Sequence, residues 1–178
     1  MKYLLPIILI TGLSLFKNIP EVTGQPAETV AQEFDTPVEA PDFVLKEVSG
    51  KEMSLKEHRG KIVLLNFFTT WCPPCRKESP SFANLSEQFK GTDLIILKIS
   101  IKEKVKSIEK YKNRFGILFA ILMDEKAKVG NAYGVWSHPT TFFIDRKGMI
   151  VGRVIGGRNW MSGDMRKYIR DLLEKKNE

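Results

Sequence analysis

Two cysteines, Cys72 and Cys75, are the only ones in the 178-residue chain, and they stand three positions apart. An apolar run, residues 62–68, ends just before them, and a segment of helix-forming composition follows. Cys72 is therefore expected at the turn, where the unpaired N–H groups and dipole of the helix lower the pKa of its thiol. Pro73 suits the first helical turn, which needs no N–H donor. Cys75, one turn on, can attack a mixed disulfide formed at Cys72, so the pair predicts thiol–disulfide exchange.

A C-x-x-C pair has two other possible uses. A structural zinc site needs four ligands, and only His58 and His138 are available to join the two thiolates. A purely structural disulfide would close a very small loop and would add little stability. Redox chemistry is the favoured interpretation, with no cofactor and no metal expected.

Strands and helices alternate around this motif and then give way to a hairpin and a last helix. This order favours a three-layer α/β sandwich with a mixed central sheet and an extra N-terminal hairpin. The expected strands are residues 43–45, 52–55, 61–68, 93–101, 117–123, 140–144 and 149–155, and the expected helices are residues 76–89, 105–115, 125–133 and 165–173.

The N-terminus has the pattern of an export signal. Lys2 precedes an apolar run over residues 3–16, which is short for a membrane span of about 20 residues. We expect residues 1–24 to be a signal peptide or an N-terminal membrane anchor, with cleavage and anchoring both open. Residues 25–37, rich in proline and acidic residues, are expected to be a linker, and residues 38–178 the folded domain.

Charge is unevenly distributed along the chain. The formal net charge is +7, but residues 41–178 hold 26 Lys and Arg against 16 Asp and Glu, a balance of +10. A basic domain is attracted to anionic membrane surfaces or acidic clients, although an ordinary solvated surface has the same composition. The lysines are scattered among acids rather than set in a block, which argues against nucleic acid as a partner.

Three segments carry a family resemblance: residues 66–80 around the cysteines, residues 40–43, and residues 138–145. They resemble the corresponding segments of the TlpA/ResA-type thioredoxin-like thiol-disulfide oxidoreductases, and the likeness extends over residues 40–173. The resemblance implies a thioredoxin-like fold, a periplasmic or cell-envelope location, and reduction of disulfides in client proteins. In several members the client is apocytochrome c. A membrane disulfide carrier is the expected electron donor.

The resemblance also assigns supporting residues. Pro139 matches the cis-proline of the family, and the backbone before it is expected to bind client peptides. His138 stands where a small or β-branched residue is usual; near Cys72 it would stabilise the thiolate when protonated, or serve as a base or ligand when neutral. An ordinary surface histidine is the alternative. If the reduction potential proved strongly oxidising, His138 and the double proline, Pro73 and Pro74, would be the expected tuning elements.

Three more positions belong to the predicted site. Asn66 occupies the position at which cytoplasmic thioredoxins carry a buried aspartate, so the proton-shuttling acid must come from elsewhere. Glu103 is the nearest candidate, with a solvated acid at a helix start as the alternative. Trp71 is expected to cover the thiols with an apolar surface that admits client peptides.

Three rival functions remain open. The direction of exchange depends on the reduction potential, so a disulfide-forming oxidant is one alternative. A peroxiredoxin-like peroxidase is a second alternative, because residues 69–72 contain the T-x-x-C motif of peroxiredoxins, but the proline expected before the threonine is missing. Two thiolates with His138 would also suit a copper chaperone, although the proteins of this kind with the same fold carry a wider C-x-x-x-C.

Overall fold

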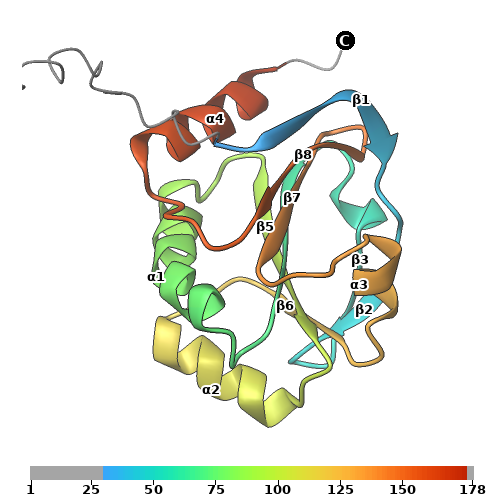
Figure 1. The fold of residues 1–178 in the computed structure, drawn as a ribbon, viewed down its shortest axis with the longest axis vertical. Coiled ribbons are helices and arrows are strands. Elements are labelled where there is room, and N and C mark those ends of the chain that lie inside the picture. The colour runs from blue at the N-terminus through green and yellow to red at the C-terminus, as the bar shows by residue number, and fades with distance from the viewer. Residues whose placement is uncertain (1–29, 176–178) are drawn as a thin grey trace, which may run out of the picture.

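An eight-stranded mixed sheet forms the centre of the computed structural model, which describes residues 30–175 (Figure 1). The strand order is β1-β8-β7-β4-β5-β6-β2-β3, with β4, β5 and β6 parallel to one another. These elements are β1 (Gln32–Glu39), β2 (Val44–Glu47), β3 (Glu52–Ser54), β4 (Ile62–Phe68), β5 (Leu94–Ile101), β6 (Ile121–Asp124), β7 (Thr140–Ile144) and β8 (Met149–Ile155). Every residue of β4 is buried, as its apolar run requires for a strand covered on both faces.

Helices cover both faces of the sheet, which confirms the predicted α/β class (Figure 1). Phe82 of α1 and Ile169 of α4 pack with Leu64 in one core, while Val63 and Tyr133 lie in the core of the opposite face. Side chains that alternate along β4 therefore enter different layers. The helices are α1 (Pro73–Gln88), α2 (Val105–Phe115), α3 (Lys128–Ala132) and α4 (Gly163–Glu174), and η1 (Lys56–His58) is a short 3-10 turn.

Both edges of the sheet are formed by N-terminal segments. At one edge β2 pairs antiparallel with both β3 and β6. At the other edge β1 pairs antiparallel with β8, with a shift in register between Glu33 and Val38. The linker prediction for residues 25–37 is therefore wrong for residues 32–37. An edge strand that is mostly exposed gains from backbone hydrogen bonds rather than alternating apolar residues, and it tolerates Pro37.

The second departure concerns α3, which begins at Lys128 rather than at residue 125. The carboxylate of Asp124 accepts hydrogen bonds from the backbone N–H groups of Lys128 and Gly130, at 2.9 and 2.8 Å. Asp124 does cap backbone donors, but it first bridges a turn in which Ala127 has a φ of 53°. The helix is shortened because that left-handed residue cannot belong to it.

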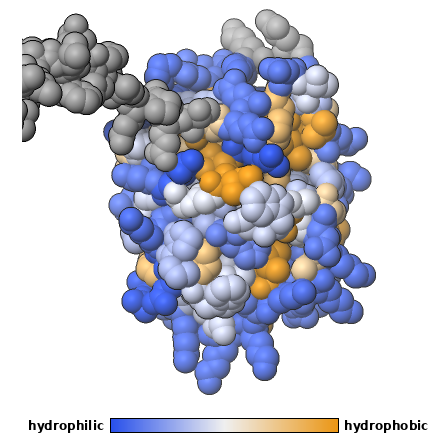
Figure 2. Space-filling view, in the orientation of Figure 1, coloured by the Kyte–Doolittle hydropathy of each residue, from blue (hydrophilic) through white to orange (hydrophobic). Residues whose placement is uncertain are grey.

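The predicted signal or anchor at residues 1–24 lies outside the described residues. Across residues 30–175, no helix combines the length and the apolar character needed to cross a membrane. On the face drawn in Figure 2, hydrophilic side chains predominate and hydrophobic ones gather in small patches.

Candidate active site

Cys72 and Cys75 form a disulfide at the start of α1, directly after the loop that follows β4. Cys72 is the N-cap residue, and its sulfur accepts a hydrogen bond from the backbone N–H of Cys75, at 3.3 Å. Pro73 and Pro74 are the first two helical residues, where no intrahelical donor is needed. Cys72 keeps 4% of its surface exposed and Cys75 keeps none. What little of the pair is exposed therefore belongs to Cys72.

The loop before β7 faces this disulfide. The His138–Pro139 peptide bond is cis, and the carbonyl oxygen of His138 lies 3.5 Å from the sulfur of Cys72. Pro139 in turn accepts a hydrogen bond from the backbone N–H of Gly156, at 2.8 Å. The loop thus lies against the accessible sulfur and is fixed to the end of β8.

The imidazole of His138 is half-buried beside the site. Burial lowers its pKa below the ordinary value of 6.5, while a backbone hydrogen bond at Ser137 and the charge of Glu103 act in the opposite direction. The net effect is a lowered pKa, so burial favours the neutral imidazole beside the disulfide.

Two tryptophans flank the disulfide and are exposed to solvent. Trp71 directly precedes Cys72 and is 70% exposed; Trp136, two residues before His138, is 78% exposed. Large apolar side chains at the surface are typical of places where another protein binds. Trp136 is not among the residues predicted from the sequence, although its position three residues before Pro139 is a usable signal.

Glu103 holds the loop between β4 and Cys72. Its carboxylate accepts hydrogen bonds from the backbone N–H of Thr70 at 2.8 Å and from the Thr70 hydroxyl at 2.5 Å. The Ser100 hydroxyl donates a third, at 2.7 Å. These bonds bring Glu103 to the active-site loop, but they engage it with hydroxyl and amide groups rather than with either sulfur.

The carboxylate nearest to the buried cysteine in sequence is not among the predicted site residues. Glu78 lies one helical turn after Cys75 and is buried with it. Its oxygens accept hydrogen bonds from Asn66 Nδ2 at 3.2 Å and from Trp160 Nε1 at 3.0 Å, and from the backbone N–H of Arg158 at 3.3 Å. Desolvation raises the pKa of Glu78, and the positive charge of Lys98 opposes that rise.

Asn66 therefore belongs to the buried site, as a hydrogen-bond donor rather than an acid. Its Nδ2 also donates to the hydroxyl of Thr141 on β7, at 2.8 Å. The i, i+3 spacing of Cys75 and Glu78 was the signal for the missed acid, since it places both residues on one helix face.

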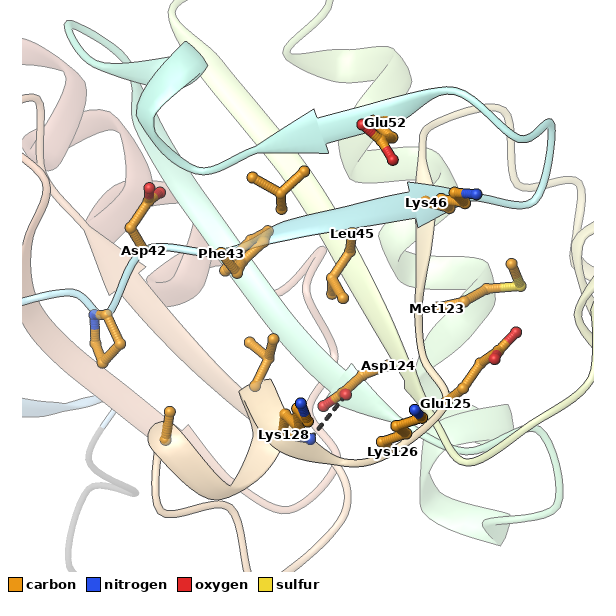
Figure 3. A pocket seen from close by; sticks show the side chains of 14 residues that line it. Asp42, Phe43, Leu45, Lys46, Glu52, Met123, Asp124, Glu125, Lys126 and Lys128 are labelled. Carbon is orange, nitrogen blue, oxygen red and sulfur yellow. Dashed lines mark hydrogen bonds between the residues drawn. The ribbon is translucent and has the colours of Figure 1, made fainter.

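Several hollows open on the surface, and two of them bear on the site. One of about 520 Å³ opens between α1 and the loop after β8, and its lining includes Pro74, Glu78 and Gly157. A larger one of about 740 Å³ lies between β2 and the turn into α3 (Figure 3). The larger hollow is lined by none of the predicted site residues, and its charged groups are of both signs, with Asp124 already bonded to the Lys128 backbone. Within residues 30–175, no group of three or more His, Cys, Asp and Glu is arranged to hold a metal ion.

Comparison with known proteins matches the region that holds these residues. A model of the AhpC/TSA family matches residues 37–153. The thiol-disulfide oxidoreductase ResA of Geobacillus thermodenitrificans is 42% identical over 117 residues, 66% of this chain and 67% of that protein. ResA of Bacillus subtilis is 37% identical over 118 residues, 66% of each chain. A thiol:disulfide interchange protein of the thioredoxin family from Chlorobium tepidum has a solved structure with a TM-score of 0.69 and 30% identity, covering 78% of this chain and 97% of that one. This likeness confirms the predicted thioredoxin-like fold.

Proposed function

The chain belongs to the AhpC/TSA family and is a thiol-disulfide oxidoreductase of the ResA type, and from that premise we propose that it reduces disulfides of client proteins outside the cytoplasm. The observation that carries the proposal is the unequal burial of the two sulfurs at the start of α1. The sulfur of Cys72 is placed to react with a client disulfide, whereas the sulfur of Cys75 is placed to react only with Cys72.

The proposed reaction has two steps. The Cys72 thiolate attacks a client disulfide, the client S–S bond breaks, and one client sulfur leaves as a thiolate. Cys75 then loses its proton to Glu78 and attacks the sulfur of Cys72, which releases the second client sulfur. Two electrons pass to the client, and the chain is left with the Cys72–Cys75 disulfide seen in the structure.

The surrounding residues have proposed roles in this cycle. Trp71 provides apolar contact for the client. The backbone at His138 and Pro139 binds the client peptide in an extended conformation beside the sulfur of Cys72. Pro73 and Pro74 fix the first turn of α1, whose unpaired N–H groups stabilise the thiolate.

Location and partners complete the proposal. Residues 1–24 direct export or anchor the chain in the membrane, and a membrane disulfide carrier returns the pair to the dithiol form. Apocytochrome c is the proposed client, since ResA-type proteins are the relatives in sequence. The balance of +10 over residues 41–178 favours clients or surfaces with negative charge.

A reduction potential tests the direction of exchange. The full chain would be equilibrated with dithiothreitol or glutathione buffers at pH 7, and the dithiol fraction read from thiol alkylation. A value near or below about −270 mV, that of thioredoxin, is expected for a reductant. A value near about −120 mV, that of a strong oxidant, would overturn the proposal.

Covalent trapping tests the cycle itself. The Cys75→Ser variant should accumulate a mixed disulfide with a client, because the second attack is removed. The Cys72→Ser variant is the matched control and should trap far less, since its remaining thiol is buried. Equal trapping by the two variants would contradict the assigned order of attack.

A further inference from the structure

A lysine side chain is fully buried in the middle of the sheet. Lys98 is on β5, its side chain is 0% exposed, and its Nζ has no hydrogen-bond partner among the residues that the structure describes. The one carboxylate that forms an ion pair with it there is Glu78, with Nζ 3.9 Å from Oε1. Burying an ammonium group in this way is unfavourable unless an opposite charge compensates.

The rest of the lysine's surroundings are aromatic. Nζ lies 4.5 Å from the ring centroid of Phe68, 4.6 Å from that of Phe82, and 6.0 Å from that of Tyr111. Ring faces attract a cation, but they equally suit an uncharged apolar chain. A methionine would therefore fill this space, so the fold alone does not require a lysine.

The same rings connect the lysine to the active site. Phe68 and Tyr111 pack in one cluster with Cys75 and Cys72. The Tyr111 hydroxyl also donates a hydrogen bond to the carbonyl oxygen of Cys75, at 3.1 Å. Glu78 follows Cys75 by one turn on α1 and both residues are buried, so the ion pair of Glu78 with Lys98 lies next to the turn that carries Cys75.

We propose that Lys98 is a positioning residue for thiol–disulfide exchange: its buried ammonium group holds Glu78 as an oriented carboxylate one turn after Cys75. The inference rests on the proposed function, and it concerns the second step of that reaction. The Cys75 S–H bond breaks as a Glu78 O–H bond forms, the Cys72–Cys75 bond replaces the bond from Cys72 to the client, and the client sulfur leaves as a thiolate. Lys98 stays protonated throughout.

The charges facing Glu78 support this assignment. Burial raises the pKa of Glu78 and lowers that of Lys98 to about 8, and in each case the charge of the partner acts in the opposite direction. Tyr111, from α2, stays neutral because burial raises its pKa. Lys77 and Arg158 line the open hollow beside Glu78 rather than the core.

The remaining neighbours of Glu78 carry no charge. Asn66 from β4 and Trp160 from the loop before α4 each donate one hydrogen bond to its carboxylate, and Thr141 from β7 binds Asn66. Lys98 is thus the buried cation that forms an ion pair with the Glu78 carboxylate within the described core.

The Lys98→Met variant tests the role. Reduced protein would be mixed with glutathione disulfide, and tryptophan fluorescence would follow the concentration-independent phase in which Cys75 releases glutathione. Without the lysine, Glu78 takes up a proton in the neutral range, so this phase should be about tenfold or more slower near pH 6. It should approach the wild-type rate as pH rises and Glu78 ionises. A loss of equal size at every pH, as a merely structural role predicts, would overturn the inference.

Two further variants keep the result specific. Lys112→Met breaks the ion pair between Lys112 of α2 and Glu47 of β2, whose Nζ and Oε1 are 3.3 Å apart, and should leave the pH profile of release unchanged. In the Glu78→Gln background, adding Lys98→Met should produce no further slowing, since the lysine acts through the acid. Additive losses would contradict the coupling.

A measurement on the unmodified protein covers the case of a variant that fails to fold. Carbon NMR of the Glu78 carboxyl should give a carboxylate shift at pH 7, and a carboxylic-acid shift would overturn the inference. If the wild-type protein itself shows no glutathione release, the proposed function fails. If wild type and Lys98→Met release glutathione with the same pH profile, only the role of Lys98 fails.

Discussion

Replacing Glu103 with alanine removes three hydrogen bonds from the loop that leads into the active site. Two of them come from Thr70 and one from Ser100. A net hydrogen bond to a charged group contributes about 1.5–3 kcal/mol, and water can replace part of it at this half-buried position. We therefore expect Glu103→Ala to lower the free energy of unfolding by about 2–4 kcal/mol.

Glu103→Gln is the matched variant, because it keeps the shape and removes the charge. Its amide oxygen can still accept from the Thr70 N–H and the Ser100 hydroxyl, and its amide nitrogen can donate to the Thr70 hydroxyl. We expect a loss of under about 1 kcal/mol and an exchange rate close to that of the unmodified protein.

Urea unfolding followed by tryptophan fluorescence measures the first effect, and the reduction of a model disulfide measures the second. For an m value of about 2–3 kcal/mol/M, Glu103→Ala should lower the midpoint by about 1 M. If only the alanine variant reduces the disulfide slowly, Glu103 acts by holding the active-site loop in place, as a clamp. If Glu103→Gln slows exchange as much as Glu103→Ala while retaining stability, the carboxylate is the proton-shuttling acid, and the clamp interpretation is refuted.

Two further predictions concern pH and packing. Burial lowers the pKa of His58 and of His138 below 6.5, so the unfolded chain binds more protons in that range and stability should fall as pH drops below about 6.5. Urea midpoints between pH 5 and pH 8 measure this, and the double replacement with alanine should flatten the curve; a flat wild-type curve would contradict the buried neutral state. A Cβ at Gly157 would lie 3.1 Å from the carbonyl oxygen of Pro74, so Gly157→Ala should cost about 1 kcal/mol and slow exchange by shifting the start of α1. Gly163→Ala meets no atom within 4 Å and should leave both properties intact, and equal losses in the two variants would discount the contact with Pro74.

The redox pair could be predicted because its signals are local. Residues 62–68 are apolar, the cysteines follow at once, and the two prolines suit only the start of a helix. The structure has this order, with β4 ending at Phe68 and Cys72 capping α1. The alternation of strands and helices could be predicted for the same reason, because each long element shows the pattern of apolar residues typical of its type.

The buried ion pair could not be predicted, because its signal is spread over two elements. Glu78 follows Arg76 and Lys77, a run that reads as the solvated face of a helix. Lys98 interrupts an apolar strand, and no neighbouring residue in the sequence indicates that it pairs with Glu78, 20 positions earlier. Strand β1 could not be predicted for a related reason, because it pairs with β8, which is far away in the sequence, and its own residues are mostly exposed.

The presence of asparagine at position 66 follows from the charges around it. Glu78 and Lys98 already balance each other in this core, and the Asn66 amide donates to the Glu78 carboxylate at 3.2 Å. An ionised aspartate at position 66 would lose that donor and leave a second negative charge buried with no cation to pair with it, a penalty of several kcal/mol. A carboxylate at position 78 of α1 and one at position 66 of β4 are therefore alternatives. In this chain the carboxylate is Glu78, which lies on the same helix as Cys75, so the helix itself fixes the spacing between the carboxylate and the thiol.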